Sequence, residues 1–199
     1  MGRIRAAMPQ FLLQQVERFE PERKTAILDA VSTEALDAIR AKLAIGWLDM
    51  TPHMEFMGQL EGTVGPDAYE DLWTEAGRNF MERPIAGGLL GMAKRLFCKK
   101  PREAVRFLPR MYALGVEGLG EVSVEDLSEN VFSVTLHHFP ADRWDFDNFV
   151  IGLAGATRGA CAVMFPDWPM EIGFETPNHE TGAADYRLVL GPDSGDVSA

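Results

Sequence analysis

The histidines are the first residues in this sequence whose chemistry could define a site. His137 and His138 are adjacent on a predicted strand, where successive side chains point to opposite faces, so the two cannot share a metal ion. We expect one of them to point inward, near a pocket, and the other to be solvated. His53 opens a predicted helix, where we expect an exposed side chain, and His179 lies in a polar loop. Because a protein metal site needs three or four converging ligands, this spacing predicts no metal-binding residue.

The two cysteines, Cys98 and Cys161, lie far apart and form no C-x-x-C motif, which is typical of a reduced, cytoplasmic protein with ordinary thiols. Cys161 falls midway along an apolar helix, where a cysteine usually behaves as a small hydrophobic residue. Arg158 precedes it by three residues and could lower the pKa of its thiol. The chain has no G-x-S-x-G motif. We therefore predict no catalytic residue, and a small enzyme that uses Cys161 or a histidine is only a third hypothesis.

A basic segment contrasts with the rest of the chain. Residues 94–110 contain seven lysines and arginines and one glutamate, whereas the whole chain carries a formal net charge of −11. Arg102, Arg106 and Arg110 recur every fourth residue and form one stripe of a predicted helix, which Lys99 extends. The net charge argues against nucleic-acid binding. The stripe is therefore either a solvated face or a contact surface for carboxylates of a second copy or of an acidic protein partner.

The elements that would position these residues are organised around a predicted helix over 145–164. Apolar residues recur along it at three- and four-residue spacing, and Asp145 or Asp147 can cap its start. Gly152, Gly155 and Gly159 interrupt the stripe, although each costs roughly 1 kcal/mol relative to alanine in a helix. They indicate that something approaches this backbone closely, which can be a sheet, the wall of a ligand pocket or a helix of a dimer.

The remaining pattern predicts an α+β fold with a helical N-terminal half packed on a C-terminal antiparallel sheet of ββαββ order. Alternating runs predict strands over 121–127, 131–139, 170–175 and 185–190, with the first two forming a hairpin. Helical spacing predicts helices before them, including a glycine-rich one over 84–97 and one from Pro101 that Pro109 kinks. No apolar run approaches the roughly 20 residues that a membrane span needs. We expect an N-terminal helical arm (1–45), an α+β ligand-binding-like domain (46–190) and a disordered tail (191–199).

Several of these segments together carry a resemblance to known proteins. They are Gly46-Trp47-Leu48, the basic helix from Pro101-Arg102 to Tyr112, the strand region 118–127, Phe149-Val-Ile-Gly with Gly159-Ala, and the closing strand Tyr186-Arg-Leu-Val-Leu. Their order over residues 45–190 resembles a myxobacterial family of uncharacterised proteins. It is similar, more distantly, to the heme-nitric-oxide-binding and 4-vinyl-reductase superfamily. The resemblance implies a helical layer and a small sheet around a small-molecule pocket, often in homodimeric signalling proteins.

The sequence departs from that superfamily at the residues that would hold a cofactor. Relatives often carry a cysteine pair around the last two strands, whereas the loop 177–184 offers only His179. The tyrosine–serine–arginine signature that holds the heme propionates has no counterpart. We therefore expect neither zinc nor heme, and no other cofactor.

The sequence thus predicts a cytoplasmic, non-enzymatic, small-molecule-binding or regulatory domain, sensor-like and dimeric. The alternative is a protein–protein adaptor whose cavity is filled core. Replacing Gly155 by leucine is expected to displace a small apolar ligand more than it unfolds the chain. The predicted interaction residues are Lys99, Arg102, Arg106 and Arg110, and the predicted ligand-binding residues are Gly88, Gly91, Met111, Tyr112, Gly155, Arg158 and Gly159.

Overall fold

The structure, a computed structural model, describes residues 2–82, 100–167, 170–174 and 177–190. The predicted helix over 84–97, Gly88, Gly91, Lys99 and the tail 191–199 lie outside the described residues.

The N-terminal half is helical, as predicted. Short helices α1 (Ala7–Val16), α2 (Pro21–Ala30) and α3 (Thr33–Ala41) precede two longer ones, α4 (Met50–Val64) and α5 (Pro66–Glu82). Ser32 caps α3 by accepting a hydrogen bond from the backbone N–H of Ala35 at 3.2 Å. Between α4 and α5, Gly65 has a φ of 83°, which favours glycine.

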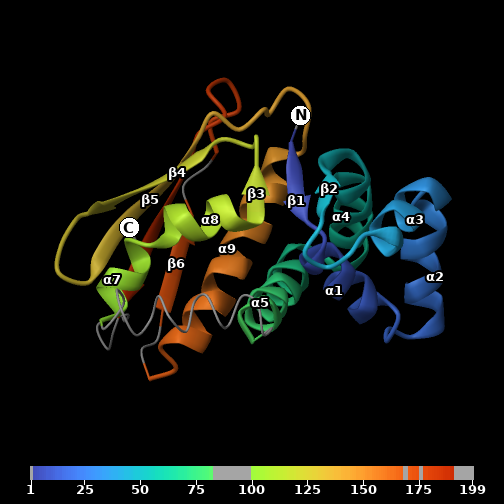
Figure 1. Ribbon diagram of the computed structural model, residues 1–199, viewed down its shortest axis with the longest axis horizontal. Helices are drawn as coiled ribbons and strands as arrows, with labels where there is room; N and C mark the ends of the chain where they lie inside the picture. Colours follow the sequence, from blue (N-terminus) through green and yellow to red (C-terminus); the bar gives the residue numbers. More distant parts are fainter. Residues whose placement is uncertain (1, 83–99, 168–169, 175–176, 191–199) are drawn as a thin grey trace.

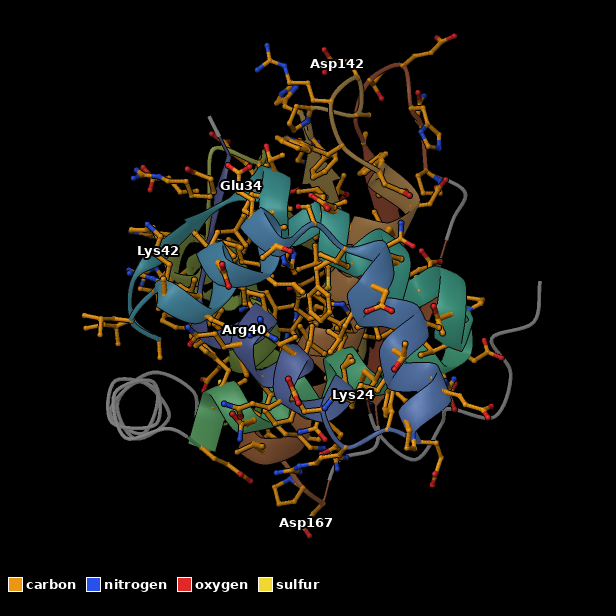
Figure 2. All side chains as sticks on the ribbon, turned by 90° about the vertical axis from the view of Figure 1, so that its right-hand side faces the viewer. Lys24, Glu34, Arg40, Lys42, Asp142 and Asp167 are labelled. Atoms are coloured by element: carbon orange, nitrogen blue, oxygen red, sulfur yellow. The ribbon has the colours of Figure 1, made fainter. Side chains whose placement is uncertain are left out.

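The outer face of the helical end is charged. Figure 2 looks onto this end and shows Lys24, Arg40 and Lys42 on its surface. Glu17 forms ion pairs with Lys24 at 2.7 Å and with Arg40 at 3.6 Å, and the Lys24 ammonium is the main cause that lowers the pKa of the Glu17 carboxyl. This face is solvated, so the apolar surfaces of the helices turn toward the rest of the molecule.

The C-terminal half has the predicted ββαββ order. Strands β4 (Glu121–Asp126) and β5 (Val131–His137) form a hairpin, α9 (Phe146–Met164) follows, and β6 (Met170–Phe174) and β7 (Ala184–Leu190) close the chain. All pairings are antiparallel in the order β4-β5-β7-β6, so β7 enters between β5 and β6. Asp145 caps α9 by accepting from the backbone N–H of Asn148 at 3.0 Å. The α+β fold predicted from the sequence is confirmed.

Two features differ from the sequence prediction. The helix from Pro101 is not one kinked helix but two, α7 (Pro101–Val105) and α8 (Leu108–Gly115), because Pro109 has no N–H to donate and its ring clashes with the carbonyl four residues earlier. A second, small sheet was not predicted: β1 (Arg3–Arg5) pairs with β2 (Trp47–Asp49) and with β3 (Val116–Glu117). Its strands are too short to show an alternating pattern.

Helices α5 and α9 run side by side between the helical end and the four-stranded sheet (Figure 1). One buried cluster extends from Ile4 through α1–α5 to the first half of α9. A second joins the sheet residues Phe132, Val134 and Leu188 to Ala160 and Met164 near the end of α9. One side of α9 therefore packs on α5, and its far end packs on the sheet. As a result, α5, α8, α9 and the sheet surround a common space.

Candidate functional site

A cavity lies in this space, with about 90 Å³ of free volume. Its walls come from α5, α8 and α9, and single residues of α1, α4, β1, β3, β4 and β7 complete it. The lining is mostly apolar, and Met8, Met81 and Met111 contribute flexible side chains that can adapt to a ligand. An apolar concave site with few polar groups is the usual form of a small-molecule site.

The residues predicted for a pocket fall into three groups. Met111 and Tyr112 line the cavity from α8. Gly155, Arg158 and Gly159 lie on α9 but not among the lining residues. Residues 88 and 91 lie outside the part of the chain that the structure describes. Three glycines that line the cavity, Gly77, Gly115 and Gly152, were not among the predicted site residues.

Gly155 and Gly159 serve the contact between α5 and α9. A Cβ atom added at Gly155 would lie 2.8 Å from Trp73 Cβ and 2.5 Å from the Glu70 carbonyl oxygen, and one at Gly159 would clash with the Thr74 carbonyl. The expectation that leucine at position 155 mainly displaces a ligand is therefore wrong, because backbone of α5 occupies that space. The sequence left a sheet, a pocket wall or a helix of a dimer as possible neighbours of the α9 glycines. For Gly155 and Gly159 the structure shows a helix, but it belongs to the same chain.

Arg158 forms a salt bridge across the same contact. Its guanidinium lies 2.6 Å from a carboxylate oxygen of Glu70 on α5, with both side chains partly buried. Cys161, one turn further along α9, is buried in the second cluster. Arg158 thus pairs with a carboxylate, and the packing places Cys161 as a small core residue.

A buried hydrogen-bond network closes one end of the cavity. The Tyr69 hydroxyl donates to Asn148 Oδ1 at 2.7 Å, and Asn148 Nδ2 donates to Glu61 at 2.7 Å and to the Met57 carbonyl at 3.3 Å. Asn148 is only 1% exposed. The carboxamide therefore joins α4, α5 and α9. Both Nδ2 protons are donated and Oδ1 accepts one hydrogen bond, so the group is satisfied within the protein.

The tyrosines that line the cavity are neutral. Burial raises the pKa of Tyr69, Tyr112 and Tyr186 well above the usual value of 10. The Tyr112 hydroxyl donates to the Leu119 carbonyl at 2.7 Å, as Tyr69 does to Asn148. None of the three offers a phenolate at neutral pH.

His53 is the histidine that lines the cavity, and the prediction that it is exposed is wrong. It is 1% exposed, and burial lowers its pKa to about 3, so the ring is neutral. Its position agrees with the spacing of Met50, Met57 and Leu60, which all point inward from α4. The inward position of His53 could therefore have been predicted from that spacing, but the prediction considered only apolar residues as inward-facing.

Two of the residues that line the cavity keep a fully buried ring nitrogen without a hydrogen-bond partner among the described residues. They are Nδ1 of His53 and Nε1 of Trp73. The two rings meet edge to face with centroids 5.9 Å apart. The Tyr69 hydroxyl, which donates to Asn148, also interacts with the Trp73 indole through its oxygen, although the two groups do not meet hydrogen-bond geometry.

The other three histidines lie away from the cavity. His137 shares a hydrogen bond of 2.8 Å with Ser123 of the neighbouring strand, and His138 is exposed with a φ of 58°. The expectation that one of this pair lies near a pocket is therefore wrong, because the buried face of β5 is that of Leu136. His179 lies 3.3 Å from Asp147. Within the described ranges, no three histidine, cysteine, aspartate or glutamate residues are placed to hold a metal ion.

The arginine stripe is partly engaged within the chain. Arg102 and Arg106 both donate to the carboxylate of Asp126 on β4, and these hydrogen bonds, chiefly that of Arg106, lower the pKa of Asp126 to about 2. The Arg110 guanidinium lies over the Phe107 ring, 5.5 Å from its centroid. Arg102 and Arg106 remain about half exposed, so a contact between this stripe and a partner remains a prediction.

The fold and the cavity can now be compared with known proteins. No family model and no curated protein matches the sequence. Solved structures do match in fold. A mutant H-NOX protein from K. algicida in the Fe(II) unliganded form has a TM-score of 0.64 at 15% identity, covering 96% of this chain and 98% of that one. The IWP-051-bound H-NOX from Shewanella woodyi in the Fe(II)CO state gives 0.59 at 15% identity, covering 98% of each chain.

An oxygen-binding H-NOX domain related to soluble guanylate cyclases gives a TM-score of 0.53 at 8% identity, covering 98% of this chain and all of that one. The described part of the chain therefore has an H-NOX-like fold. This supports the resemblance to the heme-nitric-oxide-binding superfamily at the level of the fold. The resemblance to the myxobacterial family and to 4-vinyl reductases stays a prediction.

The cavity residues do not fit a heme. Heme iron is commonly held by a histidine, a thiolate or a tyrosinate, and the tyrosines here are neutral and hydrogen-bonded elsewhere. A ligating histidine almost always donates its second ring nitrogen to an acceptor, whereas Nδ1 of His53 has no acceptor in the part of the chain that the structure describes. The described lining contains no lysine or arginine to pair with propionates. The cavity therefore matches a smaller and less charged molecule.

Proposed function

We propose that this chain is a small-molecule-binding, sensor-like domain that takes a small, mainly apolar ligand without heme. The single observation that carries the proposal is the apolar cavity, which lies inside an H-NOX-like fold. The similar domains are described with Fe(II), with CO or with oxygen. From these domains we take only that a ligand binds inside the fold. The cavity residues of this chain favour a ligand other than heme.

The two competing hypotheses, an adaptor and a small enzyme, explain the cavity less well. An adaptor with a filled core does not account for free volume beside Gly115, where an added Cβ would meet nothing within 4 Å. A small enzyme that uses Cys161 or a histidine needs a reactive group open to substrate. Cys161 is buried, and His53, the histidine that lines the cavity, is also buried. The non-enzymatic proposal is therefore favoured.

Native mass spectrometry of the purified chain tests this proposal. We expect the protein to carry additional, non-covalent organic mass that is lost on denaturation. Expression with heme supply should give no Soret band. A stoichiometric Soret band would contradict the choice of ligand. A chain that carries no additional mass and binds no member of a library of small apolar compounds would support the adaptor instead.

The cytoplasmic location, the domain boundaries at 45 and 190, and assembly as a homodimer or with an acidic protein partner belong to the same proposal. Within the described residues no helix is long and apolar enough to cross a membrane. The half-exposed Arg102 and Arg106, together with Arg110, are the surface proposed for carboxylates of the partner. Changing all three to glutamine should remove any salt-sensitive increase in mass measured by light scattering. An unchanged mass at low and high salt would leave the stripe a solvated surface.

A further inference from the structure

Exposed hydrophobic side chains gather at one place on the surface. Within the described ranges, Leu43, Ile45 and Leu114 are three of the four large hydrophobic residues that are exposed, at 76%, 58% and 43%. The Arg5 guanidinium joins their segments, because it donates to the Ile45 carbonyl at 2.6 Å and to the Leu114 carbonyl at 3.1 Å. Leu43 adjoins Ile45 through a tight turn, in which the Gly46 N–H donates to the Leu43 carbonyl at 2.7 Å. Single exposed hydrophobic residues are ordinary, but a group of them indicates an interaction site.

Arg5 is held in place but is not neutralised. Besides its two carbonyl partners, its guanidinium lies over the Trp47 ring, 3.8 Å from the centroid. In the part of the chain that the structure describes Arg5 forms no ion pair, whereas Arg3 on the same strand pairs with Glu117 at 2.7 Å. The remaining N–H groups of Arg5 can therefore donate to a carboxylate from outside, and little side-chain freedom is lost when they do. We refer to Arg5, Leu43, Ile45, Trp47 and Leu114 as the Arg5 patch.

The surroundings of the Arg5 patch are basic, although the chain as a whole is acidic. The three segments that form it, residues 3–5, 42–47 and 108–116, contain four lysines and arginines and no aspartate or glutamate. The acidic residues of the small sheet, Asp49 and Glu117, lie opposite Arg3 in the strand register and not opposite Arg5. The patch thus complements a surface that presents carboxylates beside aliphatic side chains. A nucleic-acid backbone supplies anions but no such side chains.

We propose that the Arg5 patch docks an acidic, aliphatic segment of another protein, with a carboxylate on Arg5 and aliphatic side chains on Leu43, Ile45 and Leu114. Arginine and tryptophan are among the residues that most often dominate binding at protein interfaces. The inference goes beyond the small-molecule function, and it gives an acidic partner a contact that does not depend on the arginine stripe. Leu114 also lines the cavity, so the docked segment lies beside the wall that α8 forms.

Peptide selection followed by affinity measurements tests the proposal. A phage library of random dodecapeptides is selected on the full chain, and the enriched peptides are synthesised and titrated by fluorescence anisotropy. We expect these peptides to combine aliphatic residues with aspartate or glutamate. The double variant Leu43→Ser/Ile45→Ser and the single variant Arg5→Gln should each weaken their binding at least about tenfold. Added salt should weaken binding to wild type, because exposed charge pairs are screened.

Matched controls locate the binding surface. Leu127→Ser changes the fourth exposed hydrophobic residue, in the turn between β4 and β5, and Arg143→Gln changes an exposed arginine outside the patch. Both should keep the wild-type affinity within about twofold. Arg102→Gln/Arg106→Gln should keep it as well, and a loss in that variant alone would assign the peptides to the arginine stripe and overturn the proposal.

The other outcomes are equally decisive. Enrichment of no peptide, enrichment of peptides without acidic residues, or equal affinity for wild type and Leu43→Ser/Ile45→Ser overturns the proposal. Self-association of wild type that this double variant lacks, measured by ultracentrifugation, would assign the patch to a second copy instead. If Arg5→Gln does not fold, as judged by its thermal melt, the double variant decides, since both of its side chains are exposed. Neither residue lines the cavity, so failure here leaves the small-molecule proposal intact.

Discussion

His53 shows how a single residue can link the site to stability. Its ring is buried and neutral, and burial lowers its pKa from 6.5 to about 3. Between these values the unfolded chain binds a proton that the folded chain does not, so the free energy of unfolding decreases as the pH falls below about 6.5. Above that pH both states are neutral and the contribution is complete.

This gives a pH-dependent prediction for His53→Gln. From pH 7.5 to pH 5.0, wild type should lose about 2 kcal/mol more stability than the variant, at about 1.4 kcal/mol per pH unit below 6.5. Urea unfolding at the two pH values measures the difference. His138→Asn should follow wild type. Parallel losses in wild type and His53→Gln would show that His53 takes up its proton in the folded state.

Asn148 connects three helices, and its replacement should be costly. Asn148→Ala leaves the Tyr69 hydroxyl and Glu61 without their partner inside the protein, so we expect a loss of about 2–4 kcal/mol in the free energy of unfolding. Thr63→Ala removes an exposed hydrogen bond to the Gln59 carbonyl and should cost less than about 0.5 kcal/mol. Similar losses in the two variants, measured by urea unfolding, would refute the structural role of the network.

What the sequence could predict at this scale differs from residue to residue. The inward position of His53 follows from the spacing of Met50, Met57 and Leu60, so it was available in the sequence. The pairing of Asn148 with Glu61 could not be predicted from the sequence, because Glu61 is 87 residues away and the contact depends on the packing of α4 against α9. An unpartnered nitrogen is likewise a property of the packed state alone.

At the scale of elements, the contact between α5 and α9 fixes the position of the cavity walls. The glycines of α9 correctly predicted that something approaches this helix closely, but spacing cannot tell a sheet from a helix as the neighbour. Gly77 of α5 faces Ala156 in the same way, so both helices contribute small residues. Strands β4–β7 and helix α9 were predicted within a few residues because their hydrophobic patterns repeat over enough residues to be recognised. The three strands β1–β3 contain too few residues to show such a pattern.

Two glycine-to-alanine changes separate this contact from ordinary helix propensity. Gly159→Ala places a methyl group against the Thr74 carbonyl and should destabilise the protein by about 1–3 kcal/mol. Gly58→Ala lies on the exposed side of α4, where nothing is within 4 Å, and should stabilise it by about 0.5–1 kcal/mol. Thermal unfolding compares the two. Stabilisation by both changes would mean that α5 and α9 are not in contact at Gly159.

At the scale of the whole molecule, an H-NOX-like fold surrounds a cavity whose residues suit a small neutral molecule better than a heme. The fold class could be predicted from the order of helices and strands. The cavity could be predicted only in part: Met111 and Tyr112 line it, but its walls depend on how α5, α8 and α9 meet. The account therefore depends on one claim, that the space beside Gly115 accepts an apolar molecule.

Xenon binding followed by NMR tests that claim most directly, because xenon enters dry apolar cavities without polar contacts. Gly115 lines the cavity and has open space beyond its Cα, so Gly115→Leu should fill the cavity while the chain stays folded. Gly58→Leu is the matched control on the exposed side of α4. We predict saturable shifts of the Gly152 and Met111 amides in wild type and Gly58→Leu, and a loss of at least about tenfold in xenon affinity in Gly115→Leu. Absence of xenon binding in wild type, or equal binding in Gly115→Leu, would contradict the account.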